Sequence, residues 1–204
     1  MIKNGKRHRI AFVIVFLISV LYFFRYVQIN SAYHKLQTGF DEIYYIGEEI
    51  PLEENYIDIS LQARGYSICA NALEIVDTVE YVTDMGLLVD ERQASLPERL
   101  ALVSATIRRT EGIDECLPVL LFEMYGNDFY TIVDFELFNQ INVETVQASL
   151  GVALPKASEQ TVIIPFRLDR DNFNFYTWNH LDNYPLSMRL TYGPARIIIY
   201  LTEK

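Results

Sequence analysis

The stretch RLALVSATIRRT, Arg99 to Thr110, alternates apolar and polar residues over most of its length. Every second residue from 101 to 107 is apolar: Ala101, Val103, Ala105 and Ile107. Successive side chains of a β-strand point to opposite faces, so this period of two places the four residues on one face. The stretch therefore predicts a half-buried strand.

Other strand-like segments lie on both sides of it. Residues 42–47 (EIYYIG) end at a glycine, and residues 65–76 (GYSICANALEIV) begin at one. Residues 161–168 (TVIIPFRL) predict a further strand, in which Pro165 indicates a sheet edge or a strand end because proline has no N–H to donate.

Two longer segments are typical of hairpins. Residues 118–135 (PVLLFEMYGNDFYTIVDF) place two β-rich runs around Gly126-Asn127, and residues 186–203 (LSMRLTYGPARIIIYLTE) turn at Gly193-Pro194. Short strands with regular turn signals and few helices favour a mainly β fold, a β-sandwich.

Helical signals are short. Residues 134–141 (DFELFNQI) begin with Asp134 as a candidate N-cap, and residues 142–151 allow one or two turns. Residues 171–182 place apolar side chains three apart, which predicts a short helix with Asp171 or Asn172 as its cap. One to three short helices are therefore expected.

Composition limits the class of protein. The chain has 204 residues, of which 50% are hydrophobic and 13% aromatic, enough for one folded domain and an appendage. Residues 26–204 hold 12 basic and 27 acidic side chains, a net charge of −15. Such a surface repels phosphate backbones, so nucleic acid is excluded as a partner.

The first residues indicate a membrane anchor. A basic tail, residues 1–9, precedes residues 10–24 (IAFVIVFLISVLYFF), and continuing to residue 29 gives about 30 Å of helix, the thickness of the hydrocarbon core. The positive-inside rule places the tail in the cytoplasm, the tether of residues 30–39 outside, and the domain of residues 40–204 in the extracellular space. The alternatives are a cleaved signal peptide, for which no small-x-small cleavage site follows, and a buried soluble helix.

Candidate catalytic and metal-binding groups are few. His180 is the one histidine of residues 40–204, and no G-x-S-x-G, H-E-x-x-H or glycine-rich phosphate loop occurs. Residues 169–174 (DRDNFN) begin like a calcium loop, but the glycine and glutamate that such a loop needs are missing. We therefore expect no catalytic residue, no metal and no cofactor.

Three further groups of residues have both a functional and a structural interpretation. Cys69 and Cys116 form a disulfide or remain two unlinked thiols. The aromatic residues of the segment 173–184 form a sugar-stacking platform or, as we favour, part of the core: Phe173, Phe175, Tyr176, Trp178 and Tyr184.

The acidic segment 45–60 (YIGEEIPLEENYIDIS) is a cation site or the solvated edge of the first strands. We favour the edge, because hard-cation sites need several oxygens from a tight turn. Tyr45 and Ile46 are then expected in the core, Gly47 in a turn, and Glu49 and Glu53 in solvent.

Several of these segments resemble a group of uncharacterised Gram-positive proteins. The similarity is carried by YYIGEEIPLEENY, GYSICANALEIV, LPERLALVSATIRRTEG, TVIIPFRL and PLSMRLTYGPARIIIYL, in order over about residues 40–204. In that group one N-terminal membrane segment carries an immunoglobulin-like extracellular domain. The resemblance implies this fold and location, and it supplies no catalytic residue.

Three functions remain open from the sequence. The first is a membrane-tethered extracytoplasmic binding module without catalytic activity, whose partner is a membrane or secreted protein or a cationic peptide. The second is a cell-envelope hydrolase that uses two converging carboxylates, and the third is a passive structural spacer. Whether acidic residues converge in a cleft or spread over a face discriminates the second from the others.

Overall fold

The computed structural model describes residues 19–20, 22–23, 40–53, 55–58, 61–87, 96–110, 116–127, 129–143 and 151–202. The chain divides into two compact units, Met1–Thr38 and Gly39–Lys204. Among the described residues, no helix combines the length and the apolar character that crossing a membrane requires. The predicted basic tail, the predicted tether and most of the predicted membrane segment lie outside the described residues.

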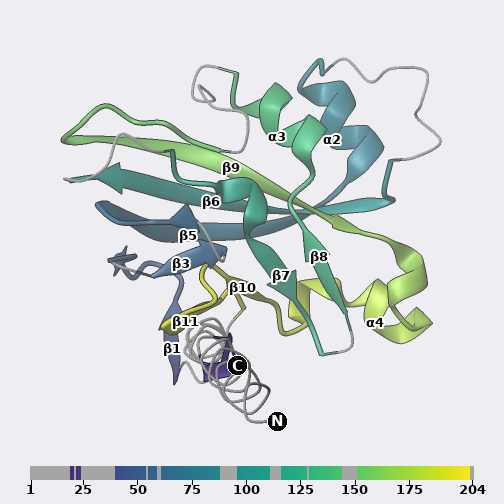
Figure 1. Cartoon of the computed structure of the whole chain (residues 1–204). Coiled ribbons are helices and arrows are strands. Elements are labelled where there is room, and N and C mark those ends of the chain that lie inside the picture. The colour runs from purple at the N-terminus through teal and green to yellow at the C-terminus, as the bar shows by residue number, and fades with distance from the viewer. Residues whose placement is uncertain are drawn as a thin grey trace, which may run out of the picture. The chain divides into compact units, whose positions relative to one another are not determined.

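The second unit is a β-sandwich of two main sheets (Figure 1). The five-stranded sheet consists, in spatial order, of β1 (Phe40–Tyr45), β11 (Ala195–Tyr200), β10 (Ser187–Arg189), β7 (Glu123–Tyr125) and β8 (Tyr130–Ile132). The four-stranded sheet consists of β2 (Ile50–Pro51), β5 (Tyr66–Asp77), β6 (Arg99–Arg109) and β9 (Ser158–Leu168). A small hairpin pairs β3 (Tyr56–Asp58) with β4 (Leu61–Gln62). The predicted β-sandwich is confirmed.

Strand β6, which the period-two pattern of residues 99–110 predicts, lies between β5 and β9. Its alternate residues are buried in the main core, as predicted: Ala101, Val103, Ala105 and Ile107. The core is closed from the other side by the inner face of the five-stranded sheet, where Met124, Met188 and Ile199 are buried. Burying both inner faces is what joins the two sheets into one domain.

The outer face of the four-stranded sheet has a second, smaller core. Two helices cover part of this face, α2 (Thr78–Asp84) and α3 (Phe135–Ile141), and Figure 1 shows both above β6 and β9, with the five-stranded sheet on the opposite side. Val82 and Leu137 of the helices pack with Leu100 and Leu102 of β6. The helix α2 was not predicted, whereas α3 was predicted correctly.

The helix caps correct one detail of the prediction. Asp134 caps α3 as predicted, because its carboxylate accepts a hydrogen bond from the Leu137 N–H at 3.0 Å. The last helix, α4 (Phe175–Asn179), is capped by Asn174, whose Oδ1 accepts from the Thr177 N–H at 2.9 Å. The predicted cap at Asp171 or Asn172 is wrong, because both residues belong to a short 3-10 turn, η3 (Arg170–Asn172), before the helix.

Short 3-10 turns also occur as η2 (Val119–Leu121) and η4 (Leu181–Asn183). The helical turns expected in residues 142–151 fall mostly on residues 144–150, outside the described residues.

Both predicted hairpins are present, since β7 pairs with β8 and β10 pairs with β11, each antiparallel. The parallel pairing of β1 with β11 was not predicted.

The edge strand β9 is protected along the part that faces α3. Pro165 lies in this edge strand, as predicted. The buried Asn142 side chain takes the place of a neighbouring strand: its Oδ1 accepts from the Ile163 N–H at 3.0 Å, and its Nδ2 donates to the Ile163 carbonyl at 2.8 Å. A bridge between Val133 and Phe166 then ties β9 to the segment that follows β8.

Candidate binding surface

The outer face of the five-stranded sheet carries two ordered rows of side chains. Because side chains alternate along a strand, the residues that flank buried Met124, Met188 and Ile199 point outward. The strand register aligns them across the sheet. The first row is Tyr45, Tyr200, Ser187, Tyr125 and Tyr130, and the second is Ile43, Ile198, Arg189, Glu123 and Ile132. We call these ten residues the tyrosine face.

The four tyrosines form two stacked pairs at the two ends of the first row. The Tyr45 and Tyr200 rings lie 5.9 Å apart between centroids at 26°, and the Tyr125 and Tyr130 rings 6.1 Å apart at 27°. Stacking fixes the orientation of the rings but leaves part of their surface exposed to solvent. Tyr45 is 51% exposed and Tyr130 is 65% exposed. The expectation that Tyr45 lies in the core is wrong, because the pleat directs Ile46 toward the core and Tyr45 outward.

An ion pair occupies the centre of the second row. The carboxylate of Glu123 accepts hydrogen bonds from the Tyr125 hydroxyl and the Arg189 guanidinium, and its Oε1 accepts from the Tyr192 hydroxyl at 2.6 Å. The Arg189 guanidinium lies 3.9 Å from the centroid of the Tyr192 ring and 4.9 Å from that of Tyr125. Both charged side chains are largely buried, at 15% exposure for Glu123 and 18% for Arg189.

This arrangement holds its tyrosines in the neutral form. Burial, followed by the hydrogen bond to Glu123, raises the pKa of Tyr125 well above that of a free tyrosine, and the same causes raise the pKa of Tyr192. Both hydroxyls therefore remain hydrogen-bond donors to Glu123. The centre of the tyrosine face is a fixed polar group surrounded by aromatic rings.

A second ion pair lies beside the rows. Arg196 of β11 and Asp41 of β1 are paired in the strand register, and their side chains lie 2.7 Å apart between Nε and Oδ1. With Glu123 and Arg189, the four charged groups of this region sum to zero. The carboxylate of Glu48 lies outside these two ion pairs, at the turn after Tyr45.

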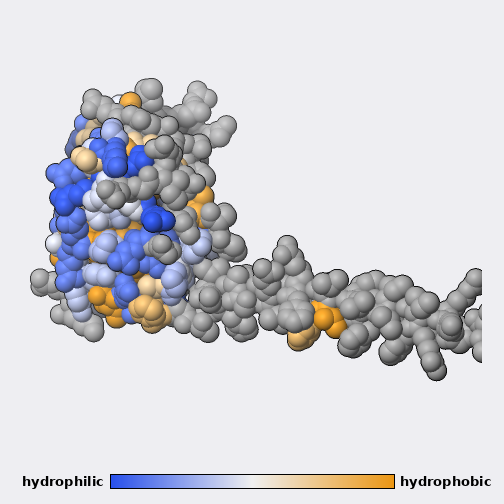
Figure 2. All heavy atoms as spheres, turned by 60° about the vertical axis from the view of Figure 1, so that its left-hand side comes forward, coloured by the Kyte–Doolittle hydropathy of each residue, from blue (hydrophilic) through white to orange (hydrophobic). Residues whose placement is uncertain are grey.

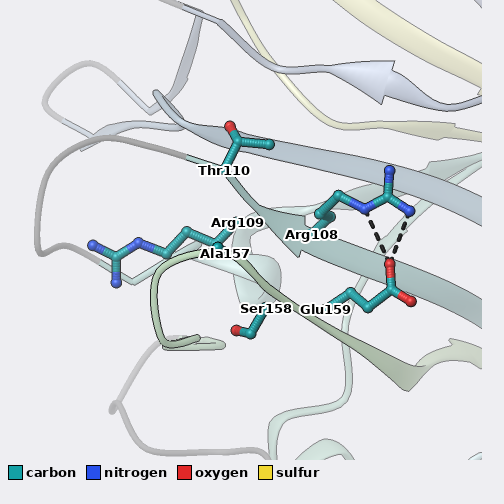
Figure 3. Close-up of a pocket in the computed structure, with 6 residues that line it drawn as sticks. All are labelled: Arg108, Arg109, Thr110, Ala157, Ser158 and Glu159. Carbon is teal, nitrogen blue, oxygen red and sulfur yellow. Dashed lines mark hydrogen bonds and ion pairs between the residues drawn. The ribbon is translucent and has the colours of Figure 1, made fainter.

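An open hollow of about 400 Å³ lies where the end of β6 pairs with the start of β9 (Figure 3). It is lined by Arg108, Arg109, Thr110, Ala157, Ser158 and Glu159. Figure 3 shows Arg108 turned toward Glu159 and Arg109 directed away from both. Arg108 lies 2.8 Å from Glu159 and 2.8 Å from Glu49, which engages its guanidinium with two exposed acids. Among the described residues, the lining has a single carboxylate, that of Glu159, and so does not supply the paired acids that the hydrolase hypothesis needs.

The acidic segment 45–60 is distributed rather than convergent. Glu48 accepts from the Tyr45 N–H at 2.8 Å across the turn at Gly47, which has the positive φ of 88° expected for a turn glycine. Glu49 binds Arg108 and also accepts from the Ser67 hydroxyl at 2.9 Å. Within the described residues, no three of the histidine, cysteine and acidic side chains are grouped to hold a metal ion.

The cysteines are two unlinked, half-buried thiols. Cys69 is paired with Thr106 on the outer face of the four-stranded sheet, where Thr106 bonds to Asn71 and Thr161. Cys116 directly precedes the buried Leu117. In this structure the two cysteines are not joined by a disulfide.

The aromatic segment around α4 divides into core and surface. The Phe173 ring packs with the rings of Phe129, Trp178 and Tyr184, with the Phe129 and Phe173 centroids 4.5 Å apart. The core interpretation is therefore correct for Phe173, Trp178 and Tyr184. It is wrong for Phe175 and Tyr176, which are 75% and 72% exposed. His180 is also at the surface, stacked on the Tyr176 ring at 4.4 Å.

The tyrosine face was missed from the sequence although its strands were predicted. The available signal is the presence of aromatic and aliphatic residues on the face opposite the core. In ARIIIY and the leucine that follows it, Ile198 and Tyr200 alternate with the buried Ile197, Ile199 and Leu201. Figure 2 shows a mainly hydrophilic side of the folded unit with hydrophobic residues gathered at its lower margin, at the height where Figure 1 has β1 and β11.

Comparison with known proteins shows a family. A family model described as Domain of unknown function (DUF5028) matches residues 41–197. No curated protein matches the chain significantly.

The solved structures to which the chain is similar include the following three. An uncharacterized beta-sandwich protein from Clostridium difficile is 12% identical, with a TM-score of 0.42, covering 80% of this chain and 96% of that one. MPT63, a secreted protein from Mycobacterium tuberculosis, is 12% identical, with a TM-score of 0.43, covering 79% and 98%. The yjhA protein from Bacillus subtilis is 10% identical, with a TM-score of 0.41, covering 74% and 82%.

Proposed function

The chain belongs to the family described as Domain of unknown function (DUF5028), and from that premise we propose that its β-sandwich is a membrane-tethered extracytoplasmic binding module. The partner is a component of the cell envelope outside the membrane. The binding surface is the tyrosine face. No catalytic step is assigned to it.

The ordered, partly exposed tyrosines are the observation that carries this proposal. Tyrosine offers a large, rigid and amphipathic contact area at a low cost in conformational entropy, and it is enriched where proteins bind. Two stacked pairs and the Glu123–Arg189 centre are held in place before any ligand arrives. Preorganisation of this kind lowers the free-energy cost of binding.

The contrast between the two sheets supports the choice of this face. Apolar residues on the outer side of the four-stranded sheet are covered by α2 and α3, so Leu100 and Leu102 are buried. On the five-stranded sheet, Ile43 is 50% exposed and Ile132 is 56% exposed. Apolar and aromatic residues that gather on an exposed face are typical of a surface that is covered by a partner.

The tether and location rest on the sequence. Residues 10–29, behind the basic tail of residues 1–9, have the pattern of an uncleaved signal anchor, which directs residues 40–204 to the outside. The resemblance to membrane-anchored Gram-positive proteins implies the same location and an immunoglobulin-like arrangement of the sandwich.

Protease accessibility tests the location. Protease added to intact cells is expected to digest residues 40–204 and to leave only the anchor region. Digestion in lysed cells alone, with protection in intact cells, would contradict an extracytoplasmic domain.

Co-sedimentation with isolated cell envelopes tests the binding surface. The full chain is expected to sediment with envelopes from which the endogenous protein has been deleted. A variant carrying both Tyr45→Ala and Tyr130→Ala is expected to lose at least about tenfold in affinity, since each removed ring forfeits stacking and buried apolar area. Tyr176→Ala is the matched control, because it removes an equally exposed tyrosine outside the tyrosine face. Equal loss in the control and in the double variant would contradict the proposal.

A further inference from the structure

We propose that the ligand of the tyrosine face is a neutral glycan chain; this inference rests on the binding function proposed above and names its ligand class. The sugar rings stack on the two tyrosine pairs, and their hydroxyl groups bond to the polar residues between them.

The tyrosine face is open at both ends. The first row crosses the whole sheet, from edge strand β1 to edge strand β8. Four interstrand spacings of about 4.8 Å give it a length of about 19 Å. A surface of this length, with rings at both ends and no closing wall among the ten residues, suits a ligand that extends beyond the sheet rather than a small compact one.

The charges of the region argue for a neutral ligand. Glu123 is paired with Arg189, and Asp41 with Arg196, so these four charges sum to zero. A cationic or anionic chain would gain nothing from these two ion pairs by charge complementarity. Other acids lie outside the two rows: Glu48 at the turn after Tyr45, and Glu49 and Glu159 around Arg108 on the four-stranded sheet.

The chemistry of the two rows matches that of a sugar. A pyranose ring has an apolar C–H face that packs on an aromatic ring and a rim of hydroxyl groups that need donors and acceptors. Tyr45 and Tyr130 present rings that are more than half exposed. Between the two ring pairs, Ser187 supplies a hydroxyl, and the Glu123–Arg189 pair beside it supplies fixed polar groups. A small number of polar groups, held in fixed positions within an aromatic surface, orients a bound ligand.

Titration calorimetry with neutral oligosaccharides tests the inference. The probes are cellohexaose, maltohexaose, laminarihexaose and chitohexaose, and hexalysine is the charged comparison. The full chain is held in phosphatidylcholine nanodiscs, because alkyl glycoside detergents present sugar headgroups that would compete. At least one neutral hexasaccharide is expected to bind, with an affinity unchanged within about twofold when the salt concentration is raised tenfold, since no charge is neutralised.

Matched variants separate stacking from loss of folding. The Tyr45→Ala, Tyr130→Ala double variant is expected to bind at least about tenfold more weakly. The Tyr45→Phe, Tyr130→Phe double variant keeps both rings and is expected to bind within about threefold of the unchanged chain, which also shows that the sheet is intact. Tyr176→Ala is expected to bind like the unchanged chain.

Three outcomes overturn the inference. If none of the four hexasaccharides binds while the chain still sediments with envelopes through Tyr45 and Tyr130, the ligand is not a neutral glycan but the proposed function stands. If the chain dimerises through these tyrosines in sedimentation velocity, the occupant of the face is a second copy. If neither glycan nor envelope binding depends on the tyrosine face, the inference and the proposed function both fail.

Discussion

Glu123 is the residue on which the polar contacts of the tyrosine face converge. It accepts from Arg189 and from the hydroxyls of Tyr125 and Tyr192. A partly buried carboxylate that is paired and hydrogen-bonded in this way fixes the side chains around it. The sequence showed none of this, because the contacts join residues 66 and 69 positions apart.

The raised tyrosine pKa values predict a loss of stability at alkaline pH. Burial and the hydrogen bond to Glu123 raise the pKa of Tyr125 and Tyr192 in the folded state. Unfolded tyrosine ionises near pH 10, so above about pH 10 the unfolded chain loses protons that the folded chain keeps, and the free energy of unfolding falls as the pH rises. Below about pH 10 this contribution is fully present.

Urea unfolding measured from neutral pH to about pH 11 checks this expectation. The Tyr125→Phe, Tyr192→Phe double variant cannot ionise at these positions, so its stability is expected to fall less steeply with pH. Parallel curves for the variant and the unchanged chain would contradict the role given to the two hydroxyls.

A second prediction at the scale of one residue concerns Asn142. Replacing it by alanine leaves the Ile163 N–H and carbonyl without the amide that satisfies them. We expect the free energy of unfolding to fall by about 2 kcal/mol or more, the cost of leaving buried polar groups unpaired. Asn179→Ala is the control, because that amide is exposed and bonds only to the Phe175 carbonyl at 2.9 Å. Equal effects of the two substitutions in urea unfolding would show that Asn142 does not protect the edge of β9.

At the scale of elements, the prediction of β6 is confirmed because that strand carries a period-two pattern of its own. In β6, the residues Ala101 and Val103 face the core, as their spacing predicted. The helix α2 was missed because Tyr81 and Val82 follow the strand β5 without a glycine or proline between them. Its start depends on Asp77, the last residue of that strand, which is also the helix cap. A residue with two such roles cannot be assigned from local pattern alone.

The cap of α2 can be tested by substitution. The Asp77 carboxylate accepts from the Val79 N–H at 3.0 Å and the Glu80 N–H at 3.1 Å. Asp77→Ala is expected to lower the free energy of unfolding by about 1 kcal/mol, the usual loss for an N-cap. Asp84→Ala removes an acid from the opposite end of the helix, where the helix dipole disfavours it, and is expected to leave stability unchanged or slightly higher. Thermal or urea unfolding that ranks the two variants in the reverse order would refute the cap.

At the scale of the whole domain, stability comes from the core that both sheets share. Phe166 of β9 is completely buried in that core, and its bridge to Val133 reaches the segment after β8. The sequence predicts a two-layered β-sandwich with two hairpins. It does not predict which strands from distant parts of the chain are neighbours within each sheet. It also could not place the tyrosine face, since its ten residues come from five strands spread over residues 40–200.

Truncation of Phe166 tests this shared core. Phe166→Ala is expected to cost about 4 kcal/mol, the loss of apolar burial together with the cavity left behind. Both sheets are expected to unfold in one transition, because the same core supports them. Phe175→Ala removes a phenylalanine that is 75% exposed and is expected to change stability by less than about 0.5 kcal/mol. Two separate transitions for the Phe166 variant would mean that the sheets are stabilised independently.

Hydroxyl-radical footprinting of the full chain, with and without isolated cell envelopes, tests the claim that the tyrosine face is the binding surface. It compares three exposed tyrosines in the same sample without any substitution: Tyr45, Tyr130 and Tyr176. The account predicts that envelopes slow the oxidation of Tyr45 and Tyr130 and leave the rate at Tyr176 unchanged. Bound chain in which Tyr45 and Tyr130 oxidise as fast as in free chain would contradict it.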